Sequence, residues 1–87
     1  MASEEGKYFE KVDTVLYEIR EEIERAKNMY PNDFHNQHEA YAVILEEIDE
    51  LWTEIKKNQK NYDLAAQDKE ATQAAAMLVR LIVELLW

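Results

Sequence analysis

Residues 70–87 read EATQAAAMLVRLIVELLW, and the pattern of this stretch decides the fold. Placed 100° apart as in a helix, its apolar side chains cover nearly the whole circumference. A helix that is apolar all round has to be covered on all sides. A chain of 87 residues offers too few other helices for that, so we expect an all-α helical bundle of three main helices, completed by a homodimer or higher homo-oligomer. The polar strip that remains holds Gln73, Arg80 and Glu84, with Glu70 at its edge.

An amphipathic helix is expected upstream, from about Ser3 to Tyr30. Ser3 is a suitable N-cap, and Pro31 ends the helix because the residue before a proline is pushed out of the α region. The opposite arc carries charged residues, so this helix should pack on one face only. Its apolar arc consists of Tyr8, Phe9, Val12, Val15, Leu16, Ile19, Ile23, Ala26 and Tyr30.

A second helix is expected to start after Asp33 or Asn36, either of which is a suitable cap, and to run to about Lys57. Residues 56–63 read as a polar loop, and the third helix begins between Asp63 and Asp68 and reaches Trp87. The second helix carries an apolar stripe that we expect to face the core: Tyr41, Ile44, Leu45, Ile48, Leu51, Trp52 and Ile55. A second line flanks it: Ala40, Val43, Glu47, Glu50 and Glu54.

Composition narrows the class of protein. With 19 acidic and 10 basic residues the net charge is −9, which argues against binding a nucleic-acid polymer, because that affinity depends on Lys and Arg neutralising phosphates. No cysteine is present, so a metal would be held by oxygen or imidazole. Arg80 and Glu84 interrupt the strongest apolar run, and the N-terminus lacks signal-peptide features. We expect residues 1–87 to form one cytoplasmic domain with no membrane partner.

Paired carboxylates are the clearest candidate for chemistry. Glu47 and Glu50 are spaced i, i+3 and therefore lie side by side on one helix face, where their charges repel. Glu70 and Gln73 repeat that spacing on the third helix. If the two helices are antiparallel neighbours, the pairs converge on an oxygen-only site that suits Mg²⁺ or Mn²⁺. The alternative is a solvated acidic face, since Glu is common on helix surfaces.

These residues also resemble a known family. Glu46-Glu47-Ile48-Asp49-Glu50 is similar to the E-E-x-x-E motif of the MazG-like all-α nucleoside triphosphate pyrophosphohydrolases. Glu70-Ala71-Thr72-Gln73 stands where that family has E-x-x-D. The resemblance extends over roughly residues 38–86, and the first helix is similar only in being amphipathic.

The resemblance implies a function and a ligand set. It makes Glu47, Glu50, Glu70 and Gln73 the Mg²⁺ ligands, and it places Glu46 beside Glu47 in catalysis, as a helper to the attacking water. It further implies that the substrate is a nucleotide, cleaved to a monophosphate and pyrophosphate. The departure is Gln73, because an amide brings no negative charge and accepts no proton. The alternative is therefore a catalytically impaired helical bundle that binds a nucleotide or a protein.

Several residues are candidates for holding the nucleotide. His38 can hydrogen-bond a phosphate or a base, Lys56 and Lys60 can meet phosphate oxygens, and Tyr62 can stack on a base. His38 and the lysines also have a purely structural interpretation. His38 would be a polar residue in the first turn of the helix, and the lysines would be cations that complement a helix C-terminus. For Trp52 and Tyr41, core packing is the better interpretation. Arg80 and Glu84, at i, i+4, are expected to pair within their helix or across a dimer.

Overall fold

The structure, a computed structural model, describes residues 3–57 and 63–87. Within these ranges every regular element is helical and no strand occurs, which confirms the all-α class. The elements in chain order are α1 (Glu4–Met29), α2 (Gln37–Ile55), α3 (Leu64–Leu81) and a π-helical turn, η2 (Ile82–Leu86), that continues from α3.

The helix ends follow from local capping. The Ser3 hydroxyl accepts a hydrogen bond from the Gly6 N–H at 3.0 Å, and α1 stops two residues before Pro31, as predicted. Asn36, rather than Asp33, caps α2, because its side chain accepts from the Glu39 N–H at 2.9 Å. Asp33 is engaged elsewhere, in an ion pair with Lys27.

The structure also shows which of the two candidate residues caps the third helix. Asp63, rather than Asp68, is its N-cap, with Oδ1 accepting from the Ala66 N–H at 3.1 Å. The expected single helix to Trp87 is wrong in one respect, because the α-helical pattern ends at Leu81 and the last turn, η2, is a π-helix. The widened turn contains Glu84, which makes long-range contacts described below.

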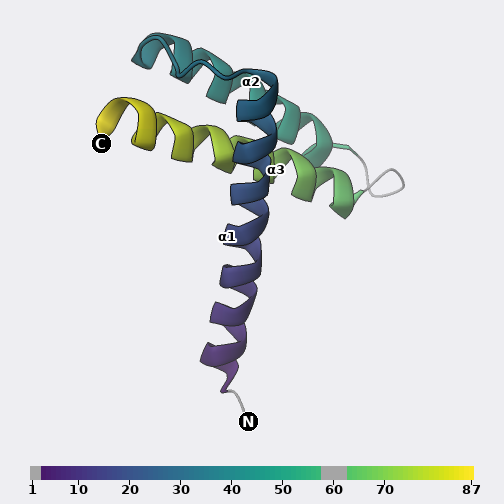
Figure 1. The fold of residues 1–87 in the computed structure, drawn as a ribbon. Coiled ribbons are helices and arrows are strands. Elements are labelled where there is room, and N and C mark those ends of the chain that lie inside the picture. Colours follow the sequence, from purple (N-terminus) through teal and green to yellow (C-terminus); the bar gives the residue numbers. More distant parts are fainter. Residues whose placement is uncertain (1–2, 58–62) are drawn as a thin grey trace.

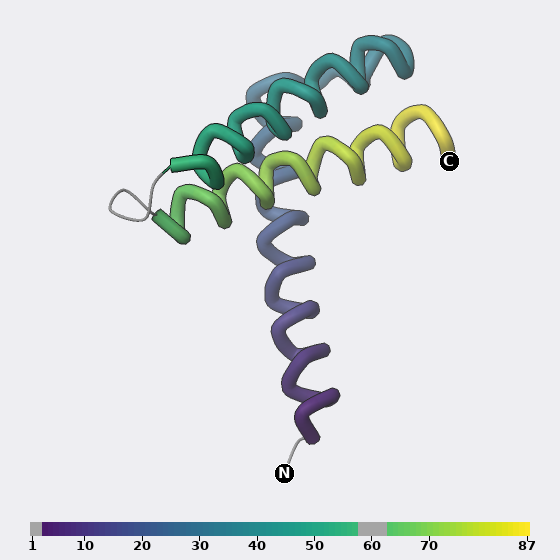
Figure 2. Tube along the Cα trace, turned by 180° about the vertical axis from the view of Figure 1, so that it is seen from behind, coloured from purple at the N-terminus to yellow at the C-terminus, as the bar shows by residue number. Residues whose placement is uncertain are grey.

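Two helices lie side by side and the third crosses them. α2 and α3 run antiparallel, and α1 meets them steeply through its C-terminal half (Figure 1). The view from behind shows the N-terminal half of α1 extending away from the α2–α3 layer (Figure 2). The antiparallel α2–α3 pair is the arrangement that the two carboxylate motifs require.

The core is small and sits where α1 reaches the layer. Much of it consists of alanine, which lets the helix backbones approach closely. It contains no large side chain that is completely buried among the described residues. The core residues are Ala26, Phe34, Ala40, Ile44, Ala76 and Met77, with Ile19, Ile23, Val43, Leu81 and Leu85 packed around them.

Our prediction of which face of α2 packs on the core is wrong within a single chain. Tyr41 and Trp52 are 65% and 56% exposed, and Ile44 is the one residue of the predicted stripe that is buried. The line that we expected to flank the stripe, with Ala40 and Val43, faces the core instead. The Ala-rich α3 packs against these smaller residues, so the large apolar side chains of α2 remain outside. No helix in the described part of the chain is both long and apolar enough to cross a membrane.

Candidate metal centre

Three carboxylates meet between α2 and α3. Glu47 and Glu50 come from successive turns of α2, and Glu70 comes from the second turn of α3. One oxygen of each lies within 4.8 Å of the other two. The antiparallel packing of the two helices therefore brings together three of the four residues predicted as ligands. We call Glu47, Glu50 and Glu70 the acidic cluster.

The acidic cluster is electrostatically strained. Partial burial raises the pKa of Glu47, and the negative charges of Glu50 and Glu70 raise it further. The pKa of Glu70 is also raised, first by burial and then by its hydrogen bond with Glu50 and the charge of that residue. Both shifts have the same meaning: the ionised form is disfavoured where like charges are crowded and partly shielded from water.

The charge of Lys69 opposes this crowding at Glu70, but the pKa of Glu70 stays raised. The nearby basic residues are engaged with other acids: Arg25 pairs with Glu22, and the Lys57 Nζ lies 2.8 Å from an oxygen of Glu54. Ion pairs to the acidic cluster itself are absent from this part of the chain. A bound divalent cation has the charge and the oxygen preference to fill that role.

Gln73 lies against the acidic cluster. Its amide makes hydrogen bonds only when the nitrogen faces the carboxylates, where it donates to Glu47 Oε2 at 3.3 Å and to Glu70 Oε2 at 3.1 Å. In this orientation Gln73 holds the two carboxylates from α2 and α3 together. To act as a metal ligand, the amide would turn its oxygen toward the ion, because the nitrogen has no lone pair to offer.

A cleft opens beside the acidic cluster. Glu46, Glu47 and Gln73 form part of its wall, so the cleft and the cluster are continuous. Its volume is about 640 Å³, within the range of roughly 300–1,000 Å³ that is usual for small-molecule sites. The rest of the lining is about half apolar. The apolar residues are Ala26, Met29, Tyr30, Pro31, Phe34, Val43 and Met77, and the polar and charged ones are Glu22, Arg25, Asn32, Asp33, Glu39 and Arg80.

The remaining predicted residues are dispersed. His38 is exposed in the first turn of α2, and Lys56 is the exposed C-cap residue of the same helix. Neither lines the cleft. Lys60 and Tyr62 lie outside the described residues, so their predicted contacts with a nucleotide stay predictions.

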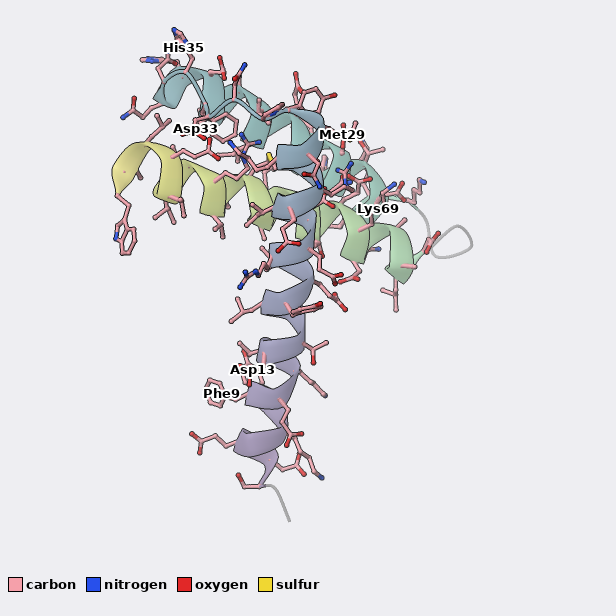
Figure 3. All side chains as sticks on the ribbon, viewed as in Figure 1. Phe9, Asp13, Met29, Asp33, His35 and Lys69 are labelled. Carbon is pink, nitrogen blue, oxygen red and sulfur yellow. The ribbon has the colours of Figure 1, made fainter. Side chains whose placement is uncertain are left out.

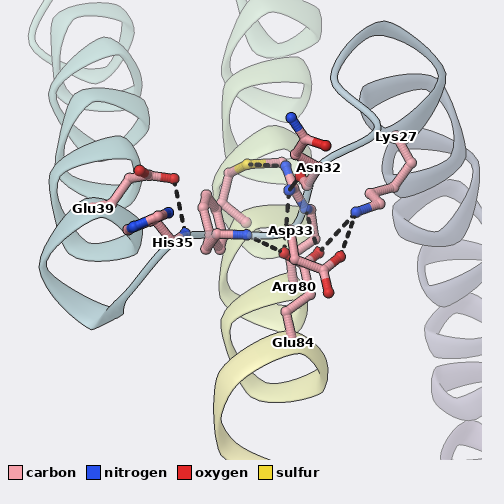
Figure 4. A network of polar contacts seen from close by, with 9 residues as sticks. Lys27, Asn32, Asp33, His35, Glu39, Arg80 and Glu84 are labelled. Carbon is pink, nitrogen blue, oxygen red and sulfur yellow. Dashed lines mark hydrogen bonds and ion pairs between the residues drawn. The ribbon is translucent and has the colours of Figure 1, made fainter.

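Arg80 and Glu84 form a second buried polar group at the other end of α3. The predicted pairing within the helix is confirmed: Arg80 Nε lies 2.8 Å from Glu84 Oε2, and both side chains are less than 10% exposed. Figure 4 shows this pair between α1 and the loop before α2. Lys27 of α1 approaches Glu84 at 3.7 Å, and the Phe34 N–H donates to Glu84 Oε1 at 2.7 Å.

The surroundings of Glu84 determine its ionisation. Burial by itself would raise the pKa of Glu84, but the hydrogen bonds from Arg80 and the Phe34 N–H, with the charges of Arg80 and Lys27, lower it below the ordinary value. Arg80 also stacks on Phe34, with its guanidinium carbon 4.3 Å from the ring centroid. These contacts pin the loop onto α3. Sequence spacing identified only the local pair, because Phe34 is 50 residues away from Glu84.

Comparison with known proteins adds no relative. The chain matches no protein-family model, no curated protein and no solved structure.

Proposed function

We propose that this protein is a divalent-cation-dependent nucleotide pyrophosphohydrolase, which converts a nucleoside or deoxynucleoside triphosphate to the monophosphate and pyrophosphate. The observation that carries the proposal is the convergence of Glu47, Glu50 and Glu70, from two helices, within 4.8 Å. The spacing of these residues along the chain is that of the MazG-like motifs. Three carboxylate oxygens suit Mg²⁺, an ion that keeps several waters and binds substrate phosphates, with Mn²⁺ as the alternative ion.

The chemistry assigned to the residues is simple. A divalent ion at this position supplies charge neutralisation for the phosphates and a lower pKa for a coordinated water. Glu47 and Glu50 would hold the ion from α2, and Glu70 would hold it from α3. Glu46 lines the cleft next to Glu47, and we assign it the role of positioning the attacking water by hydrogen bonding. A water oxygen replaces the pyrophosphate oxygen on the α-phosphorus, and no covalent enzyme intermediate is required.

The cleft suggests how a nucleotide is held. Its polar wall at Glu46, Glu47 and Gln73 adjoins the acidic cluster, while apolar side chains such as Phe34 and Met77 line another part. A triphosphate at the polar wall would direct the base toward the apolar part. His38, Lys56, Lys60 and Tyr62 remain the candidates for further contacts with the substrate.

Product analysis tests the proposal directly. Purified protein is incubated with Mg²⁺ or Mn²⁺ and a panel of nucleoside and deoxynucleoside triphosphates, and we expect a monophosphate and pyrophosphate in equal amounts. Glu47→Gln should lower kcat by about 10²-fold or more, because it removes an ionised ligand. Asp49→Asn is the matched control, since Asp49 is an exposed carboxylate of the same helix outside the acidic cluster. Absence of turnover with every nucleotide and both ions contradicts the catalytic proposal.

A second candidate function is a nucleotide- or protein-binding bundle without catalysis, and the position of Gln73 favours it. The amide stands where the resembled family has a carboxylate, and it hydrogen-bonds Glu47 and Glu70. Gln73→Asp separates the two functions. If the scaffold has only lost an acid, this variant should bind Mg²⁺ more tightly and gain turnover. If Gln73→Asp binds Mg²⁺ but cleaves nothing, the binding function stands.

We also propose that the chain associates with copies of itself. Supporting this, Leu78, Ile82 and Val83 on the outer side of α3 and η2 are between 44% and 58% exposed. A monomer of this size would leave these side chains in water. Sedimentation velocity over a range of concentrations measures the assembly state.

A further inference from the structure

α1 consists of two halves that share one apolar arc. In the C-terminal half, Ile19, Ile23 and Ala26 of this arc pack on the core. In the N-terminal half the same arc continues with Tyr8, Phe9, Val12, Val15 and Leu16, of which all but Val12 are about half exposed or more. Figure 3 shows Phe9 projecting sideways from this half, well away from α2 and α3. We call residues 4–17 the α1 arm.

The α1 arm is patterned for a helix partner. Its apolar residues recur at three- and four-residue intervals, as on a helix that packs against another helix. Its other arc carries Lys7, Lys11 and Asp13, so only one side is suited to burial. A helical segment of about 14 residues is marginal in water without tertiary packing. The bare arc is continuous with the part of α1 that α3 already covers.

The accessible surface area of the chain indicates how much surface a partner could bury. The accessible surface is 6929 Å². A compact monomer of 10.3 kDa would expose about 5,400 Å² by the usual scaling with mass, so roughly 1,500 Å² per chain is in excess. A standard protein–protein interface buries about 800 Å² per partner. The excess is therefore enough for a stable interface between two copies.

A second bare surface lies on α2. Tyr41, Leu45, Ile48, Trp52 and Ile55 form one line on the helix and each is more than 40% exposed. With the exposed residues of α3 and η2 described above, one chain thus presents three apolar helix faces, and two copies related by a two-fold axis can cover the α1 arm of each other.

We propose that the α1 arm is a docking element for a second copy of this chain, so that its apolar arc is buried in a two-fold symmetric pair. This inference deepens the proposed self-association by naming the surface that carries it, and it rests on that part of the proposed function and on no catalytic step. Each copy carries a net charge of −9, and the two copies repel. Salt screens that repulsion, so the apolar association strengthens as ionic strength rises.

Matched charge insertions on the full chain test the α1 arm. Leu16→Glu places a carboxylate inside the apolar arc, and Phe9→Glu does the same about two turns away. Thr14→Glu places the same charge on the polar arc, where the side chain is exposed. Sedimentation equilibrium gives the dimer dissociation constant for each variant. We expect both arc variants to raise it by about tenfold or more, and Thr14→Glu to leave it within about twofold.

The possible outcomes distinguish the role of the α1 arm from self-association as such. A dimeric wild type whose association is equally unaffected by Leu16→Glu and Phe9→Glu overturns the role of the α1 arm while self-association stands. A wild type that stays monomeric at every concentration overturns both, and binding of that monomer to phospholipid vesicles would then assign the arc to a lipid surface. Far-UV circular dichroism checks the fold. If Leu16→Glu loses helix, Leu16→Ala replaces it, and weaker association with wild-type helicity supports the proposal.

Discussion

The two ends of the helical segment formed by α3 and η2 present partly buried carboxylates in opposite electrostatic settings. At one end, Glu84 is paired with Arg80, approached by Lys27 and hydrogen-bonded by a backbone N–H, and its pKa is lowered. At the other end, Glu70 lies beside Glu47 and Glu50 and has no ion pair among the described residues; its pKa is raised, although the charge of Lys69 acts in the opposite direction. Burial disfavours the charge at both ends, so the neighbouring groups decide the direction. The paired carboxylate holds the fold together, and the unpaired ones are suited to receive a cation.

Breaking the Arg80 pair should have the largest effect. Arg80→Leu leaves Glu84 buried with only Lys27 and the Phe34 N–H as partners, and loses the stacking on Phe34. Removing one partner of a buried ion pair costs about 3–5 kcal/mol, and we expect a loss of that size in the free energy of unfolding, measured by urea denaturation.

Arg20→Leu is the matched control for this experiment. Arg20 pairs with Glu24 at the same i, i+4 spacing, but both side chains are more than 60% exposed. An exposed helical pair contributes about 0.3–0.5 kcal/mol, so this variant should unfold almost like the wild type. Equal losses in the two variants would show that burial of Arg80 does not matter.

Adding a divalent cation should give the next largest effect. An ion that binds only the folded state stabilises it by about 2.7 kcal/mol when present at 100 times its dissociation constant. We expect Mg²⁺ or Mn²⁺ to raise the thermal midpoint of the wild type, measured by calorimetry. Glu47→Gln should lose most of the rise, whereas Asp49→Asn should keep it. A midpoint that does not move with either ion would leave the acidic cluster as a surface feature.

The smallest effect is expected from reducing the charge repulsion within the acidic cluster in the absence of metal. Glu47→Gln removes one of three like charges, and such repulsion on a helix costs about 0.2–0.5 kcal/mol, so the metal-free variant should be slightly more stable than the wild type at neutral pH. The gain should disappear on acidification. The folded-state pKa of Glu47 is raised, so the wild type loses stability as pH rises from the unfolded value through the folded one. Urea denaturation at several pH values measures this difference.

Glu84→Gln provides the complementary test, because its effect on the free energy of unfolding should have the opposite sign to that of Glu47→Gln. The folded-state pKa of Glu84 is lowered, so its contribution to stability is present above the unfolded value and is lost as pH falls through the folded one. Glu84→Gln should therefore be less stable than the wild type at neutral pH, with the difference narrowing in acid. The same pH trend for both variants would contradict the contrast between the two ends of α3.

Much of the fold was predictable from local pattern. Ser3 and Pro31 bound α1 as expected, because capping and proline geometry act on neighbouring residues. The spacing of Glu47, Glu50 and Glu70 predicted their meeting once α2 and α3 were assumed antiparallel. The face of α2 was not predictable, because the line with three glutamates packs on α3 through its small residues Ala40 and Val43 while the more apolar stripe stays largely exposed. The hydrogen bond between Glu84 and the Phe34 N–H could not be predicted either, because no local sequence pattern indicates a contact between residues 50 positions apart.

The amino-acid sequence by itself determined where the helices lie, the excess of negative charge and which carboxylates share a helix face, because these depend on residues within a few positions of one another. Only the tertiary structure decided that the alanine-rich face of α3 selects the smaller side of α2, that Gln73 sits against two carboxylates, and that the α1 arm extends beyond its own core. These features depend on how closely whole helices approach, and that distance is set by the side chains of both partners together.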